Sequence, residues 1–170
     1  EVLKNDAEIS DVFYIGCAKN PEKEIAEREG LDFYSLNVSG MPRKIGFKLF
    51  FWFFEVLSAT IKAIYYLFKL KPDVVFGTGG YVTGPVLMAA KVLRIPYMIH
   101  DPDAHPGIVN RFMSNGAKKV SLAFEQAKKY IKNPNAEVLG NPIRNKLSSR
   151  SREGAIRELG LNPDKKTIVA

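Results

Sequence analysis

Cysteine is scarce in this sequence, and its shortage excludes two classes of protein. Cys17 is the single cysteine among 170 residues, so neither an internal disulfide framework nor a cysteine-rich zinc site is expected. This usage is typical of a reducing compartment such as the cytosol. The first residues also lack the basic segment and apolar core of a signal peptide. Because 46% of the residues are apolar, intrinsic disorder is excluded as the main state.

Acidic residues are outnumbered, with 18 Asp and Glu against 25 Lys and Arg, which gives a net charge of +7. Such a surplus can indicate a nucleic-acid partner. Here most of the surplus lies between Met41 and Lys71, where six basic residues and one acid accompany a dense run of aromatic residues. A nucleic-acid site would instead place its cations along a polar groove, so we expect no nucleic-acid partner.

Short apolar runs alternate with helical segments along the chain. We expect strands at 11–16, 31–38, 73–77, 96–100, 120–123 and 136–139. We expect helices at 20–29, 45–70, 84–93, 106–114 and around 125–131, with Asn20 as the cap of the first. This alternation predicts an α/β fold, with a Rossmann-like parallel sheet flanked by helices. Residues 1–145 would form this domain. Residues 146–170 would be a linker and the start of a second domain, with a helix at 152–159 and a strand at 166–170.

The segment from 47 to 68 is mostly aromatic and aliphatic. Its charged residues recur every seven positions, at Lys48, Glu55, Lys62 and Lys69. On a helix they form one narrow stripe, since seven residues make nearly two turns. The helix could be buried in the core with only this stripe in water, could span a membrane, or could lie on a membrane surface. A span is disfavoured because each charge costs about 2.5–3.5 kcal/mol at a helix centre.

We expect residues 61–70 to be buried in the core. For residues 41–56 we favour a membrane-surface patch, with core packing or a protein partner left open. An aromatic cluster of this size is unusual in water, and basic neighbours would attract anionic headgroups. The expected membrane residues are Arg43, Lys44, Lys48, Phe50, Phe51, Trp52, Phe53 and Phe54.

A glycine-rich loop follows the expected strand at 73–77 and opens the next helix. It contains Gly77, Thr78, Gly79, Gly80 and Tyr81. Glycines let the backbone approach a ligand closely, and free N–H groups at a helix start attract an anion. The spacing matches neither the dinucleotide fingerprint nor a P-loop. The loop therefore indicates either an anion site or a tight turn that needs glycine for its shape.

Both histidines and two acids of the chain lie together in the loop after the expected strand at 96–100. They are His100, Asp101, Asp103 and His105. Because carboxyl ends of parallel strands meet at one sheet edge, this loop should lie beside the glycine loop. It could bind a metal, or place His100 or Asp101 at a cleft for polar recognition. It could also be a structural turn in which one acid caps the following helix.

Four blocks of sequence resemble the MurG family, which transfers N-acetylglucosamine from its UDP donor to lipid I. They are Lys71–Pro85, Ile95-Pro96 together with His100, Pro106–Arg111 and Gly140–Arg144. The resemblance implies the amino-terminal, acceptor-binding half of a GT-B glycosyltransferase. It implies an inverting transfer from UDP-N-acetylglucosamine to the muramoyl sugar of lipid I, giving lipid II, without a cofactor or metal. The family's first strand and its loop with the usual general base would precede Glu1. Most of the UDP site would follow near Lys166, so the chain alone should be inactive.

The resemblance also implies roles for single residues. Gly77, Thr78, Gly79 and Gly80 would hold the acceptor pyrophosphate, with Tyr81 beside it. His100 and Asp101 would serve catalysis, and Asn110 would line the acceptor cleft. Asp103 and Arg144 would contact the UDP-sugar donor. The family's usual Glu-Gln-Asn is Asp101-Pro102-Asp103 here, so a carboxylate stands where the family has an asparagine.

The lipid tail of such an acceptor implies a peripheral enzyme on the cytoplasmic face of the bacterial inner membrane. A non-catalytic acceptor-binding and membrane-anchoring subunit of a split transferase is an alternative. A metal-dependent phosphohydrolase using His100, Asp101, Asp103 and His105 is another.

Overall fold

A computed structural model describes residues 9–19, 21–42, 46–143, 151–163 and 165. The chain divides into two units, residues 1–140 and 141–170. Several predicted features lie outside the described residues: the Asn20 cap, the cations Arg43, Lys44 and Arg144, and the strand at 166–170. The predicted domain boundary after residue 145 stays a prediction.

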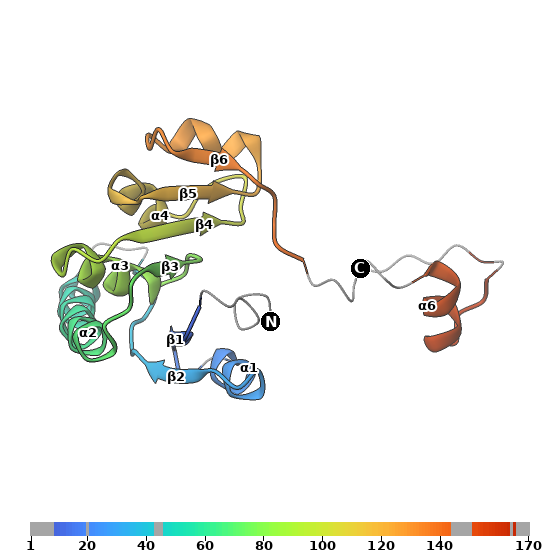
Figure 1. Cartoon of the computed structure of the whole chain (residues 1–170), viewed down its shortest axis with the longest axis horizontal. Coiled ribbons are helices and arrows are strands. Elements are labelled where there is room, and N and C mark those ends of the chain that lie inside the picture. Colours follow the sequence, from blue (N-terminus) through green and yellow to red (C-terminus); the bar gives the residue numbers. More distant parts are fainter. Residues whose placement is uncertain (1–8, 20, 43–45, 144–150, 164, 166–170) are drawn as a thin grey trace. The chain divides into compact units, whose positions relative to one another are not determined.

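The first unit contains two parallel sheets. β1 (Phe13–Gly16) pairs with β2 (Asp32–Ser35). The larger sheet has four strands side by side in chain order, as Figure 1 shows: β3 (Val75–Gly77), β4 (Tyr97–Asp101), β5 (Lys119–Leu122) and β6 (Ala136–Val138). All neighbouring strands are parallel, which confirms the predicted Rossmann-like arrangement. The division into two sheets was not predicted, because strand patterns do not show which strands pair.

Helices connect the parallel strands. They are α1 (Glu22–Arg28), α2 (Phe47–Leu70), α3 (Thr83–Val92) and α4 (Ile108–Met113), with 3-10 helices η2 (Ser114–Gly116) and η3 (Glu125–Tyr130). In the second unit, α6 (Arg152–Glu158) begins after Ser151, whose Oγ accepts a hydrogen bond from the N–H of Gly154. This contact is the expected N-cap for a serine at a helix start.

The core lies around the larger sheet. Leu87 of α3, Ile99 of β4, and Val120 and Leu122 of β5 are completely buried. A fully buried aliphatic side chain of this size contributes about 1.5–3 kcal/mol. The near-continuous burial of β4 agrees with the apolar run at 95–99, which is typical of a parallel strand covered on both faces. The core therefore fixes β3, β4 and β5, whose carboxyl ends carry the predicted loops.

Helix α2 buries a narrow face of small residues against α3. Ala59, Thr60, Ala63 and Leu67 are its buried residues. The prediction that residues 61–70 show water only a charged stripe is wrong, because Ile61, Tyr65 and Phe68 are 60%, 60% and 69% exposed. The small side chains of Ala59, Thr60 and Ala63 let α2 and α3 approach closely, so one narrow face of α2 is enough for their packing. Ile64 and Tyr66 also pack partly against the core, while the opposite apolar side of the helix is left exposed.

Candidate functional site

The glycine loop between β3 and α3 has a shape that requires glycine at two kinds of position. A methyl group added at Gly77 would lie 2.8 Å from Cγ2 of Thr83, so the close approach of strand and helix excludes a side chain. Gly79 and Gly80 have φ angles of 93° and 81°, a region that other residues rarely adopt. The Thr83 hydroxyl donates a hydrogen bond to the Gly79 carbonyl and ties the loop to the helix.

The start of α3 is suited to an anion. The first turn of α3 contains no acidic residue, and no side chain caps its N-terminus. The amino end of a helix carries a partial positive charge and N–H groups that lack partners within the helix. Both interpretations of the loop are therefore compatible with its geometry: glycine is needed for shape, and the helix end remains open to a negatively charged ligand.

Tyr81 leaves the glycine loop and contacts a distant segment. Its side chain is 64% exposed. A methyl group added at Gly40 would lie 2.8 Å from Cζ of Tyr81, so the ring packs directly on this glycine. The segment after β2 and the glycine loop thus meet at one edge of the protein. Gly40 was missed by the sequence analysis, since no local pattern links it to residue 81.

His100 and Asp101, at the end of β4, are both buried. Nδ1 of His100 lies 3.1 Å from Oγ of Ser121, its neighbour across the strand pair. The carboxylate of Asp101 accepts hydrogen bonds from the backbone N–H groups of Asp103 at 3.0 Å and Gly107 at 3.3 Å. These bonds fold the loop around Asp101, as in the structural turn considered above. Ser121 was also missed, because its role depends on the register between β4 and β5.

Asn110 connects the two predicted loops. Its Nδ2 donates to Oδ2 of Asp101 at 2.7 Å. A methyl group added at Gly79 would lie 3.3 Å from the same Nδ2, so the amide stands between Asp101 and the glycine loop. The side-chain oxygen of Asn110 is buried and has no hydrogen-bond partner among the described residues. Leaving a buried acceptor unpaired costs about 1–3 kcal/mol, which makes this atom the most unusual feature of the site.

The remaining predicted residues are more dispersed. Asp103 is exposed, and its side chain makes none of the contacts that organise the turn. The His105 ring packs on Tyr130, with ring centroids 4.4 Å apart, and Arg111 lies over the same Tyr130 ring. Within the described ranges, no group of three or more His, Cys, Asp or Glu side chains could hold a metal ion. The geometry gives the metal interpretation no support there.

Burial also affects the tyrosine that anchors this region. The Tyr97 hydroxyl donates to the carbonyl of Met113 at 2.8 Å and so joins β4 to the end of α4. Desolvation by burial raises the pKa of Tyr97 above its ordinary value. Tyr97 lies at the amino end of β4, away from the loops, and its role is to hold α4 in place.

The amino-terminal half of α2 exposes a cluster of phenylalanines, here called the phenylalanine cluster: Phe50, Phe51, Phe53 and Phe54. Neighbouring rings are in edge-to-face contact. Trp52 differs from them, because it is only partly exposed and its Nε1 donates to the Ser39 carbonyl at 3.0 Å. Glu55 accepts bonds from the N–H and the hydroxyl of Ser39 at 2.8 and 2.6 Å. Trp52 and Glu55 therefore hold the segment after β2, while the phenylalanines remain free.

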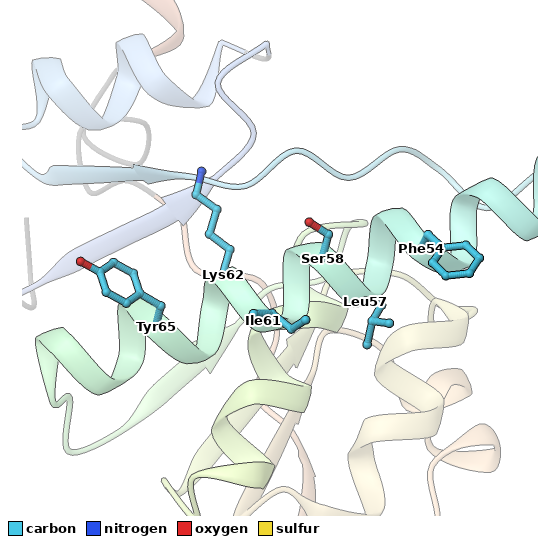
Figure 2. Close-up of a pocket in the computed structure, with 6 residues that line it drawn as sticks. All are labelled: Phe54, Leu57, Ser58, Ile61, Lys62 and Tyr65. Atoms are coloured by element: carbon cyan, nitrogen blue, oxygen red, sulfur yellow. The ribbon is translucent and has the colours of Figure 1, made fainter.

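Farther along the same face lies a shallow hollow of about 560 Å³. Figure 2 shows that all of its lining side chains project from α2: Phe54, Leu57, Ser58, Ile61, Lys62 and Tyr65. It shares only Phe54 with the predicted membrane residues. None of the described helices is long and apolar enough to cross a bilayer.

The parallel βα units, with the glycine loop at the carboxyl edge of the sheet, define a Rossmann-like α/β domain. The sequence matches the glycosyltransferase family 28 N-terminal domain over residues 1–122, and the chain belongs to this family. The predicted resemblance and fold class are thereby confirmed.

Two curated relatives carry the name UDP-N-acetylglucosamine--N-acetylmuramyl-(pentapeptide) pyrophosphoryl-undecaprenol N-acetylglucosamine transferase. The protein from Halalkalibacterium halodurans is 37% identical over 99% of this chain and 46% of its own length. The protein from Bacillus subtilis is 38% identical over 94% of this chain and 44% of its own length. The chain thus spans about half the length of the curated relatives it matches.

Solved structures agree on the fold. The crystal structure of Acinetobacter baumannii MurG is 28% identical, with a TM-score of 0.64 over 84% of this chain and 41% of that chain. A UDP-N-acetylglucosamine 2-epimerase is 18% identical with a TM-score of 0.59 and shows the shared fold alone.

Proposed function

We propose that the protein containing this chain is an inverting glycosyltransferase of peptidoglycan synthesis. It would move N-acetylglucosamine from UDP-N-acetylglucosamine to the muramoyl sugar of lipid I and form lipid II. The observation that carries the proposal is the similarity, over nearly the whole chain, to relatives named for this transfer. Those relatives are single chains named as the transferase, so a non-catalytic subunit of a split enzyme is not favoured.

The acceptor pyrophosphate would bind at the glycine loop. Gly77, Thr78, Gly79 and Gly80 would present backbone N–H groups, and the start of α3 would add its partial positive charge. The uncapped helix start and its lack of acids support this proposal. Tyr81 would stand beside the pyrophosphate, on the side of the segment that contains Gly40.

Donor binding and catalysis would involve the loop after β4 together with the rest of the longer protein. The sugar hydroxyl would attack the anomeric carbon and UDP would leave, with no cofactor. Asp103 is exposed in this loop and available to the donor, and Arg144, outside the described residues, would reach UDP. His100 would line the cleft from β4, held by Ser121. The general base would come from another segment of the longer protein.

The phenylalanine cluster would hold the enzyme to the cytoplasmic face of the inner membrane as a peripheral protein. Four exposed rings would enter the headgroup region, and Lys48 would interact with anionic lipids. Each cation near the surface contributes about 1 kcal/mol. The acceptor's lipid tail never leaves the bilayer, so such a patch would keep the glycine loop close to its ligand.

The test uses the full-length protein with UDP-N-acetylglucosamine and a lipid I analogue. We expect UDP release that depends on the lipid, and a product heavier by one N-acetylhexosamine in mass spectrometry. UDP release at the same rate without the lipid I analogue, or transfer to an acceptor without a diphosphate, would contradict the proposal.

A further inference from the structure

The segment after β2, residues 36–42, forms neither helix nor strand, and α2 holds its backbone. Every polar group of Ser39 bonds to that helix. The N–H and the hydroxyl of Ser39 donate to the two carboxylate oxygens of Glu55, and its carbonyl accepts from Nε1 of Trp52. Hydrogen bonds to an ionised acceptor are shorter and stronger than neutral ones. The three bonds together therefore fix Ser39 against one turn of α2.

Gly40, the next residue, extends this fixed position to the glycine loop. A methyl group added at Gly40 would lie 2.8 Å from Cζ and 3.0 Å from Oη of Tyr81. The φ angle of Gly40 is outside the positive range of Gly79 and Gly80, so the backbone itself tolerates alanine at this position. The nearest atoms to such a methyl group all belong to Tyr81. It is the tyrosine ring, and not the backbone conformation, that requires glycine at residue 40.

We infer that Gly40 sets the position of Tyr81 beside the acceptor's diphosphate, and that Glu55 of α2 is a positioning residue for this contact. Glu55 acts through Ser39 and touches no substrate itself. This inference rests on the proposed function and deepens it. Glu55 directly follows Phe54 in the chain, so the turn that binds the membrane also holds the contact with Tyr81. The diphosphate is thereby received at a fixed distance from the phenylalanine cluster.

The first test separates the contact at Gly40 from general damage to the fold. Equilibrium binding of a short-chain prenyl diphosphate, which stays in solution, is measured on the full-length protein. Gly40→Ala should weaken this binding about three- to tenfold, because the added methyl group displaces the Tyr81 ring. In a Tyr81→Ala background the same substitution should change binding by less than about twofold, since no ring is left to displace. Gly46→Ala is the matched control and should leave binding unchanged, because a methyl group there meets no atom within 4 Å.

A loss of the same size in both backgrounds, or no loss from Gly40→Ala alone, would overturn the role of this contact. No binding of the diphosphate by the wild-type protein would also refute the inference. Turnover of the wild-type protein with UDP-N-acetylglucosamine and a lipid I analogue is measured in parallel. Its absence would refute the proposed function, while the diphosphate binding still decides the role of Gly40. If Gly40→Ala does not fold, the variants of Glu55 decide the inference.

The positioning role of Glu55 has its own comparison. Glu55→Ala removes both acceptors from Ser39 and should weaken diphosphate binding about three- to tenfold, with UDP-N-acetylglucosamine binding within about twofold. Glu55→Gln keeps an acceptor for the N–H and should restore most of the affinity. Tyr66→Phe is the matched control, because the Tyr66 hydroxyl also joins α2 to this region by donating to the Ser35 carbonyl at 3.2 Å. It should lower the melting temperature and leave diphosphate binding unchanged. If Glu55→Ala likewise lowers only the melting temperature, Glu55 is a purely structural residue and the inference fails.

Discussion

The phenylalanine cluster allows a quantitative test of membrane binding, with a matched control on the same helix. Phe51 and Phe53 are 69% and 59% exposed, so both rings are available to a bilayer. Burying a whole phenylalanine side chain is worth about 1.5–3 kcal/mol. Scaled by exposure, replacing both residues with Ser should cost about 2–4 kcal/mol of membrane affinity, or about 30- to 700-fold in vesicle partitioning.

The control replaces two residues near the other end of α2. Tyr65 and Phe68 are 60% and 69% exposed, nearly the same as the first pair. The midpoint of this pair lies about 22 Å farther along the helix axis than that of the first pair, at 1.5 Å per residue. The Tyr65→Ser, Phe68→Ser protein should bind vesicles like the wild type. Trp52 is left unchanged, because its bond to Ser39 makes it part of the fold.

The assay is flotation of the full-length protein with vesicles that contain an anionic lipid, with circular dichroism as the check of folding. We expect the Phe51→Ser, Phe53→Ser protein to lose vesicle binding and the Tyr65→Ser, Phe68→Ser protein to keep it. Equal losses in both pairs would mean that the whole exposed face of α2 lies on the membrane. Unchanged binding in the first pair would refute the role of the phenylalanine cluster.

Three further predictions concern the fold and the glycine loop. Gly79→Ala and Gly80→Ala should each cost about 1–3 kcal/mol in urea unfolding, since both residues have positive φ. Both should weaken acceptor binding, and Gly79→Ala should weaken it more, because its added methyl group also presses on Nδ2 of Asn110. Trp52→Phe should lose about 0.5–1.5 kcal/mol of stability with its bond to Ser39 and keep vesicle binding. Because burial raises the pKa of Tyr97, its contribution to stability is complete below the ordinary tyrosine pKa and is lost as pH rises through the folded value. Tyr97→Phe should therefore reduce the loss of unfolding free energy between about pH 8 and pH 11, and an unchanged loss would contradict this.

The local sequence determined the scaffold of the site. The apolar runs at 73–77 and 96–100 predict parallel strands covered on both faces, and Gly77–Pro85 predicts a tight strand-to-helix turn. Burial is as expected for β4 but not for β3, where Phe76 is 56% exposed. These features depend on neighbouring residues, because burial pattern and backbone freedom act within a few positions. Parallel pairing then places both loops at one edge, and the contact between Gly79 and Asn110 agrees with that placement.

The tertiary structure decided the roles of the side chains. An aspartate after a strand can be a base, a metal ligand or a cap, and only the three N–H groups that converge on Asp101 distinguish these roles. The apolar circumference of α2 likewise does not show which face will be covered. Packing buried the side with Ala59 and Ala63 and left Phe68 in water. Sequence patterns set which backbone forms, whereas hydrogen-bond partners and buried faces depend on residues that are distant along the chain.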